Sequence, residues 1–228
     1  MLIFILSYMK NNPLQQAHAT AFNMNQPQGT LWIHLLKKIL NNTLEKANCI
    51  PCRTVDALNK FLVEGQDILI NEQNFLYFDQ VILMFKRFLL WQKKHTIKNL
   101  IVSDLNNNIL YVSQTWEGKM HDKMMCEIEK LKFSKKVRLW LDSGFQGFNP
   151  ENAEINRPKK KPKGKELIEI EKKSFQQISR TRVKVEDAIG NCKVFRIVKE
   201  EIRSFIDDFR DLFMVLACAL SNFKLKYQ

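Results

Sequence analysis

The chain has 228 residues, of which 45% are hydrophobic and 26% charged. This ordinary globular composition excludes disordered and fibrous proteins and leaves room for one large domain or two smaller ones. Lys and Arg number 36 against 24 Asp and Glu, a net charge of +12, which favours a polyanionic partner, nucleic acid before a membrane surface. Because no apolar stretch reaches the roughly 20 residues that span a bilayer, and residues 1–9 lack a basic leader, we expect a soluble, cytoplasmic protein.

Apolar residues at three- and four-residue spacing predict helices over residues 14–24 and 30–44, with a polar break at 25–29. Two short helices around a tight turn could be a DNA-reading helix-turn-helix or a plain helical hairpin. In the first case the second helix would offer its polar side chains to a major groove. These are Gln28, Thr30, His34 and Lys37.

The pattern then changes to strands, which predicts an α/β fold with a central mixed sheet. We expect strands at 67–70, 97–104, 109–115 and 137–141, with a hairpin turn at Asn106–Asn108. We expect helices at 122–131, 169–193 and 206–225. Residues 74–92 are almost continuously apolar and fit neither pattern, although one long buried helix would accommodate them.

Positive charge concentrates between residues 157 and 203, which hold fifteen Lys and Arg against seven Asp and Glu. Residues 157–165 (RPKKKPKGK) combine lysines with prolines and a glycine, so they predict an exposed loop. The segment is either a solvated linker or a surface that binds a phosphate backbone, and the density of like charge favours the second interpretation.

Two acids stand at the ends of predicted elements, Asp142 after a strand and Asp122 where a helix begins, and a third, Glu186, lies within a predicted helix. Acids that converge beside cations suit Mg²⁺ or Mn²⁺, whose hard ions take carboxylate oxygens and water. The alternatives are structural pairing with Lys and Arg and, for Asp122, a helix cap. Gly190 within the helix would make room for a close backbone or ligand.

The five cysteines, with one lone CxxC pair at Cys49 and Cys52, indicate neither a disulfide framework nor a zinc site.

Six ordered blocks resemble the DDE endonuclease domain of bacterial insertion-sequence transposases, a domain shared with Harbinger-type transposases. They are KKHTIKNL (93–100), GKMHDK (118–123), LDSGFQG (141–147), RPKKKPKGKEL (157–167), ISRTRVKVEDAIGNCKVFRI (178–197) and LSNFKL (220–225). The resemblance implies a helical, helix-turn-helix-like DNA-binding region at 1–62 and a ribonuclease H-like domain at 63–228. It also implies DNA transposition and recombination by a nucleoid-associated protein that acts on transposon ends and target DNA, as a homodimer.

The resemblance assigns roles to individual residues. Asp142 matches the acid after the fourth strand, Glu186 the final glutamate and Asp122 the aspartate of a Gly-x-x-His-Asp element. These three would be the catalytic residues and the ligands of Mg²⁺ or Mn²⁺. A second group of basic side chains would hold the DNA backbone: Lys159, Lys160, Lys161, Lys163, Arg180, Arg182 and Lys193.

The chain departs from the family at the end of the first strand, where the family has Asp-Gly-Thr-Glu. Here Asn71 stands where the first catalytic aspartate should be. A neutral amide binds a metal ion less well than a carboxylate, so cleavage by this copy should be impaired, and Asp67 or Glu72 would have to substitute. Residues 71–92 could be translated out of frame. The alternatives to an active transposase are therefore an inactive DNA-binding remnant or repressor of the element, and a basic nucleic-acid-binding protein whose acids serve folding alone.

Overall fold

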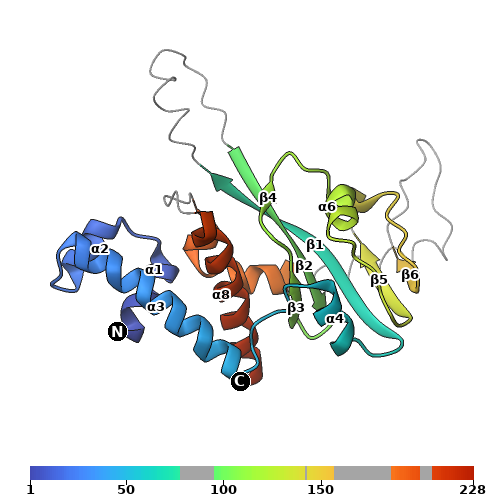
Figure 1. Ribbon diagram of the computed structural model, residues 1–228, viewed down its shortest axis with the longest axis horizontal. Helices are drawn as coiled ribbons and strands as arrows, with labels where there is room; N and C mark the ends of the chain where they lie inside the picture. The colour runs from blue at the N-terminus through green and yellow to red at the C-terminus, as the bar shows by residue number, and fades with distance from the viewer. Residues whose placement is uncertain (78–94, 142, 157–185, 201–206) are drawn as a thin grey trace, which may run out of the picture.

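The computed structural model describes residues 1–77, 95–141, 143–156, 186–200 and 207–228 (Figure 1). The helices are α1 (Leu2–Asn11), α2 (Gln15–Ala21), α3 (Gln26–Lys46), α4 (Val55–Phe61), α6 (Asp122–Ile128) and α8 (Asp207–Lys226). The strands are β1 (Gln66–Tyr77), β2 (His95–Asp104), β3 (Ile109–Val112), β4 (Trp116–Glu117), β5 (Val137–Leu141) and β6 (Ala153–Asn156). Short 3₁₀ helices η1 (Ser143–Phe145) and η2 (Arg196–Val198) complete the described elements, and residues 186–193 are also helical.

The strands form one mixed sheet in the order β3-β2-β1-β5-β6, with β4 paired to β2. Strand β2 runs antiparallel to both of its neighbours, β1 and β3, whereas β5 runs parallel to its neighbours β1 and β6. The expected α/β class with a mixed sheet is confirmed. The expected hairpin turn is also confirmed, because the Asp104 carboxylate accepts hydrogen bonds from the backbone N–H groups of Asn106 and Asn108, and Asn107 takes a left-handed φ of 66°.

Strand β1 is much longer than the four residues expected from the sequence. Its backbone stays paired with β2 from Ile68 opposite Asp104 to Tyr77 opposite His95. A buried helix starting at residue 74 is therefore wrong, since residues 74–77 continue the strand; residues 78–94 lie outside the described residues. Pairing of β1 with β5 ends earlier, at Ile70 opposite Leu141.

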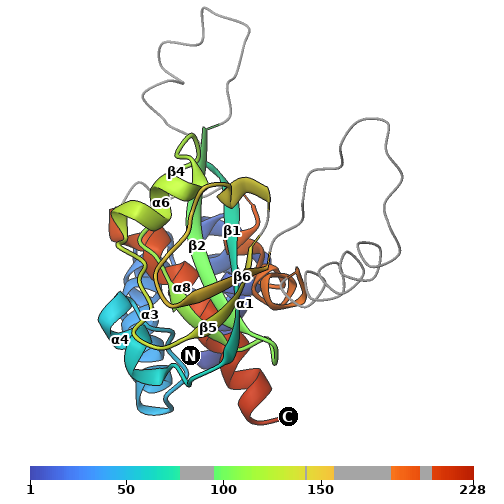
Figure 2. The same ribbon diagram turned by 90° about the vertical axis from the view of Figure 1, so that its right-hand side faces the viewer.

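The two faces of the sheet carry different layers, because alternate residues of a strand point to opposite sides. On one face Leu69, Ile97 and Ile101 pack with α1, α3 and α8. On the other face Ile70, Leu100 and Leu139 pack with α4, α6 and η1. In Figure 1 the N-terminal helices lie on the left, α8 lies between them and the sheet, and α4 and α6 pack on the other face of the sheet; Figure 2 views the same arrangement from the right-hand side.

Helix α3 begins at Gln26, inside the segment expected to be a polar break. The reason is local: the Asn25 side chain accepts from Gln28 N–H, the Gln28 side chain accepts from Asn25 N–H, and Pro27 fits the first turn of a helix. Gly29 lets α2 and α3 approach closely, since a Cβ there would lie 2.6 Å from the Ala19 Cβ.

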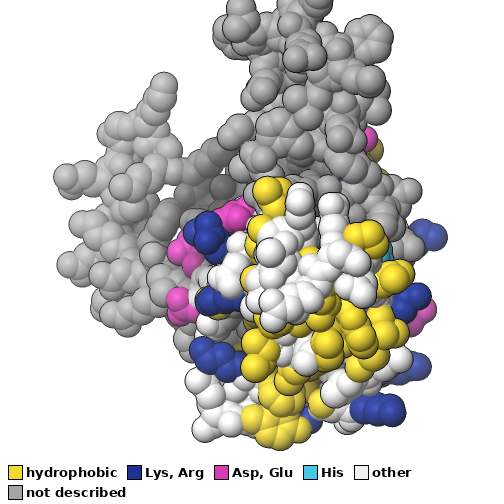
Figure 3. Space-filling model, turned by 90° about the vertical axis from the view of Figure 1, so that its left-hand side faces the viewer, with side chains coloured by type: hydrophobic (Ala, Val, Ile, Leu, Met, Phe, Trp, Pro, Cys, Tyr) yellow, Lys and Arg dark blue, Asp and Glu magenta, His cyan; other side chains and the backbone are white. Residues whose placement is uncertain are grey.

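The face of α3 expected to read DNA is partly a packing face. Lys37 is only 5% exposed and its Nζ lies 4.8 Å from the centre of the Phe209 ring on α8. The expectation that Lys37 is offered to a groove is therefore wrong; Gln28 remains exposed, and His34 and Thr30 are half-buried. Apolar side chains instead gather on the outer face of the N-terminal helices (Figure 3), where Leu31, Leu35 and Ile39 form an exposed stripe along α3. In the part of the chain that the structure describes, no helix has both the length and the hydropathy to cross a bilayer.

Candidate functional site

The candidate site lies where the parallel strands β1 and β5 stop pairing. Ile70 and Leu141 are the last paired residues, and both are buried among the side chains that α6 covers. Asn71 follows Ile70 and is still paired through its backbone to Ile101 of β2. Asp142 follows Leu141 and lies outside the described residues. Because β4 precedes it, β5 is the fifth strand in chain order rather than the expected fourth.

Asp122 is the first residue of α6 and does not cap it. The cap is His121, whose Nδ1 accepts the Lys123 N–H at 3.4 Å. The cap role considered for Asp122 is therefore wrong, although a carboxylate in the first turn still favours the helix through the helix dipole. The carboxylate of Asp122 is left to interact with the sheet.

Asp122 pairs with a lysine of the sheet. The Lys98 Nζ on β2 lies 2.9 Å from Asp122 Oδ1, and the two side chains are only 13% and 14% exposed. Lys98 lies on the same face of β2 as Leu100, the face covered by α6. The sequence block KKHTIKNL contains this lysine, but no pattern in the sequence links it to an acid far along the chain.

The other oxygen of Asp122 lies against the turn that follows β5. A Cβ on Gly144 of η1 would be 2.1 Å from Asp122 Oδ2, so only glycine leaves room for this carboxylate. Gly144 comes two residues after Asp142 in the sequence. Asp122 is thus held between β2 and the turn beside the predicted position of the second acid.

Glu186 is exposed at the start of the helical residues 186–193. On the packing side of this helix, Ile189 and Cys192 are buried among residues of α8, as the helical spacing of these apolar side chains predicts. That is the opposite face of the sheet from α6, so the helices that carry Asp122 and Glu186 lie in different layers. None of the described atoms lies within 4 Å of the position that a Cβ on Gly190 would take, so none of the described residues makes the expected close approach, and a ligand there stays a prediction.

One of the predicted DNA-contacting residues lies in the described part of the chain. Lys193 is exposed, whereas Lys159, Lys160, Lys161, Lys163, Arg180 and Arg182 lie outside the described residues. Asp67, considered as a substitute for the missing aspartate, lies four residues before Asn71 on β1. Its carboxylate accepts hydrogen bonds from Arg138 at 2.6 Å and from the Trp140 indole at 3.0 Å, so it is already engaged.

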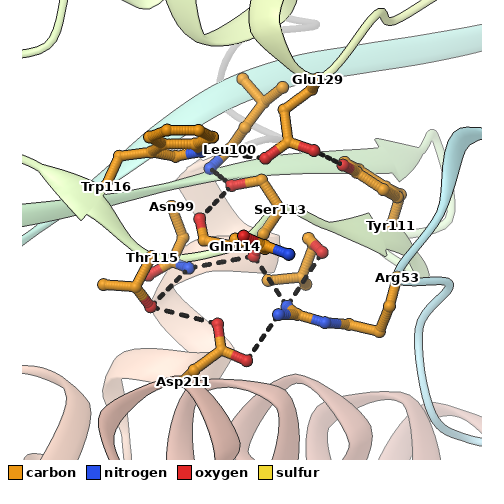
Figure 4. Close-up of polar contacts among 11 residues, drawn as sticks. Arg53, Asn99, Leu100, Tyr111, Ser113, Gln114, Thr115, Trp116, Glu129 and Asp211 are labelled. Carbon is orange, nitrogen blue, oxygen red and sulfur yellow. Dashed lines mark hydrogen bonds and ion pairs between the residues drawn. The ribbon is translucent and has the colours of Figure 1, made fainter. Parts of the chain in front are cut away.

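A polar network that the sequence did not suggest joins the sheet to α8 (Figure 4). Arg53 donates to the carbonyl oxygens of Val112 and Ser113 and to the Asp211 carboxylate at 2.5 Å. The other Asp211 oxygen accepts from Thr115. The members are scattered from residue 53 to residue 211, and none stands in a recognisable motif.

A second carboxylate near this network fastens α6 to the sheet. Glu129, which follows α6, accepts from the Tyr111 hydroxyl at 2.7 Å and the Trp116 indole at 2.9 Å (Figure 4). Burial and the hydrogen bond to Glu129 raise the pKa of the Tyr111 hydroxyl well above its usual value. This tyrosine therefore stays protonated and serves as a structural donor.

The donor chemistry of the predicted acids fits a hard divalent cation, which the DDE endonuclease superfamily generally uses. The space beside Gly144 holds the Asp122 carboxylate, which is only 14% exposed, next to the turn that follows β5. Among the described residues, no three His, Cys, Asp or Glu side chains come together as a metal-binding group. The full ligand set of Asp122, Asp142 and Glu186 stays a prediction.

Comparison with known proteins identifies the family. The model of the DDE superfamily endonuclease family matches residues 83–222. A probable transposase for insertion sequence element IS702 from Microchaete diplosiphon is 26% identical over 171 residues, which cover 67% of this chain and 62% of that relative's length. No solved structure gives a significant match. Five of the six quoted blocks lie within the matched region, and the sixth, at 220–225, overlaps its end. Since the matched region is more than half of the chain, this protein belongs to the DDE superfamily endonucleases.

Proposed function

We propose that this chain is a transposase-type protein that binds DNA and descends from enzymes that cut and join DNA strands with divalent metal ions. The parallel pairing of Ile70 with Leu141 is the observation that carries this proposal. The residues that follow them, Asn71 and Asp142, are the positions that match the first two acids of the family. Two acid positions after adjacent parallel strands suit a shared ion at the carboxyl edge of the sheet.

In this proposal Asp122, Asp142 and Glu186 are the metal-binding and catalytic residues, with Mg²⁺ or Mn²⁺ as the ion. The ion would activate the attacking oxygen and stabilise the leaving oxygen of a phosphodiester. The order β3-β2-β1-β5-β6, with β2 antiparallel to β1, supports a ribonuclease H-like domain at 63–228. The protein would act as a nucleoid-associated homodimer on transposon ends.

The DNA backbone would be held by the lysine-rich segment and by the basic side chains near Glu186, of which Lys193 is exposed. The helices of residues 1–62 would add sequence reading in the manner of a helix-turn-helix. Because Lys37 is buried, this role falls to exposed positions of α3 such as Gln28 and Lys38.

A second candidate function is a catalytically inactive remnant that occupies its DNA ends or represses the active element. The observation that favours it is Asn71, whose amide offers one neutral oxygen where the metal needs charge. Asp67 does not compensate, since Arg138 and Trp140 occupy its carboxylate.

A cleavage assay with Asn71→Asp separates the two candidates. The substrate is a supercoiled plasmid that carries the ends of the encoding element, incubated with Mn²⁺. We expect no nicking by the wild-type chain and measurable nicking by Asn71→Asp, because the added carboxylate completes the acid set. Gel electrophoresis reports the nicked form, and Asn71→Asp combined with Asp142→Asn is the matched control that should be silent.

The other outcomes are equally informative. Robust cleavage by the wild-type chain would refute the inactive candidate. If neither protein binds the element's ends more tightly than unrelated DNA of the same length, the transposase-type proposal itself fails. Reading the gene around codons 70–93 in all three frames tests the frameshift hypothesis, which requires an Asp-Gly-Thr-Glu sequence in another frame.

A further inference from the structure

We propose that Lys98 is a positioning residue that serves as the internal counter-ion of Asp122, and that a divalent cation binding to Asp122 must displace it. This inference rests on the proposed metal-binding role of Asp122. It adds a regulatory component to the site, because the protein carries a cation of its own where the metal ion would bind.

The first support is the geometry of the pair. Lys98 Nζ lies 2.9 Å from Asp122 Oδ1, at hydrogen-bonding distance, and both side chains are largely buried. A buried carboxylate without a compensating positive charge is strongly disfavoured, so the pair stabilises the metal-free protein. A divalent cation bound to the same carboxylate would be repelled by the lysine at this short distance.

The second support is that Lys98 and Asp122 both have backbones held in regular structure, whereas their side chains differ in length and flexibility. Lys98 is held in β2 between Asn74 of β1 and Trp116 of β4. Asp122 is a short side chain whose Oδ2 lies beside Gly144, so its carboxylate has little freedom. The lysine has a flexible four-carbon stem, and it is therefore the partner that can move away when a metal ion arrives.

The third support is that the neighbouring lysine does not share this arrangement. Lys123 follows Asp122 directly, yet its Nζ pairs with Glu127 on the same helix at 3.4 Å, and both side chains are more exposed than the Lys98 pair. Lys123 has the same charge and lies on the same helix as Asp122, so it is a matched control for any general effect of removing a lysine.

The test measures Mn²⁺ binding and thermal unfolding of the full chain with the variants Lys98→Met and Lys123→Met. We expect Lys98→Met to bind Mn²⁺ about tenfold more tightly by titration calorimetry, because the competing charge is gone. Without metal, Lys98→Met should have a lower Tm than wild type, and added Mn²⁺ should raise its Tm more than that of wild type. Lys123→Met should match wild type in both measurements.

Two further variants test whether the effects of Lys98→Met come from the lost charge and not from a general disturbance of the fold. Lys98→Arg keeps the charge and should restore the metal-free Tm and the weaker Mn²⁺ affinity. In an Asp122→Asn background, Lys98→Met should no longer tighten Mn²⁺ binding or lower the Tm, because the pair is already broken.

The inference is overturned if Lys98→Met binds Mn²⁺ no more tightly than wild type, if neither protein binds Mn²⁺, or if its Tm loss is undiminished in the Asp122→Asn background. If Lys98→Met does not fold, Lys98→Gln removes the charge in its place, with Lys98→Arg again as the variant that keeps the charge. None of these measurements uses DNA. Failure of the inference is thus distinguishable from failure of the proposed function, which would appear as absent DNA binding with the Mn²⁺ result unchanged.

Discussion

At the scale of single residues, the contact between Gly144 and Asp122 is the tightest constraint on the candidate site. We expect Gly144→Ala to destabilise the protein by about 1–3 kcal/mol, because the new methyl group overlaps the Asp122 carboxylate and pushes it from Lys98. Urea unfolding followed by circular dichroism measures this change. Gly190→Ala is the control: it is an exposed helical glycine with open space, so it should stabilise by up to about 1 kcal/mol. Equal effects of the two substitutions would contradict the crowding argument.

The sequence predicted the types of residue at the site better than their partners. Asp122 could be selected because it begins a helix, and the exposed position of Glu186 with Ile189 buried beside it follows from helical spacing. The pairing of Asp122 with Lys98 joins residues of different elements, and no local pattern reports such a contact. The same limit applies to Asp67, whose engagement with Arg138 depends on the register of two strands.

At the scale of elements, α1 and α2 meet through a buried histidine. His18 donates from Nε2 to the Phe4 carbonyl oxygen at 2.9 Å and packs against the rings of Phe4, Tyr8 and Phe22. Burial lowers the pKa of His18 below its ordinary value of 6.5, although the hydrogen bond to Phe4 partly opposes this shift. The folded protein therefore holds this histidine neutral.

From this shift we predict that the protein loses stability in mild acid. Below pH 6.5 the unfolded chain binds a proton at His18 that the folded chain does not, so the free energy of unfolding falls as pH decreases through 6.5. Denaturant titrations at pH 7.5, 6.5 and 5.5 measure this dependence. His18→Gln should flatten it, and His34→Gln should do so in part, because burial also lowers the pKa of His34. An unchanged slope in His18→Gln would refute the assignment.

The existence of most described elements was predictable, whereas their bounds were less so. Apolar spacing found α3, β2, β3, β5 and α8, because each buries one side against a core. Strand β1 exceeded the prediction because its later residues are held by backbone pairing to β2, which periodicity does not report. Helix α3 began early because a capping box and a proline start it within polar residues.

At the scale of the whole molecule, Arg53 and Asp211 join the N-terminal part of the chain, the sheet and α8. We expect Asp211→Asn to cost about 1–3 kcal/mol of unfolding free energy, because Arg53 loses its charged partner and Thr115 a strong acceptor. Thermal unfolding measures the loss. Glu127→Gln, which removes an exposed pair on α6, should stay within about 0.5 kcal/mol. A similar cost for both would show that the network does not hold the layers together.

The arrangement of layers was the least predictable feature of the molecule. Sequence patterns gave the α/β class, but not which helix covers which face of the sheet. The placement of α6 on one face and of Glu186 with α8 on the other depends on contacts between residues far apart in the chain. For the same reason the sequence does not predict the burial of Lys37, because the ring of Phe209 that covers it comes from the last helix.

The central position of β1 has a consequence for how the protein folds. Its antiparallel neighbour β2 is connected to β3 by a tight turn, so β2 and β3 can pair quickly through contacts that are local in the sequence. Its parallel neighbour β5 can join only after the chain between residues 70 and 141 has come back on itself, a costly closure. We therefore expect the edge that carries the candidate site to assemble late during refolding, after the hairpin that supplies Lys98.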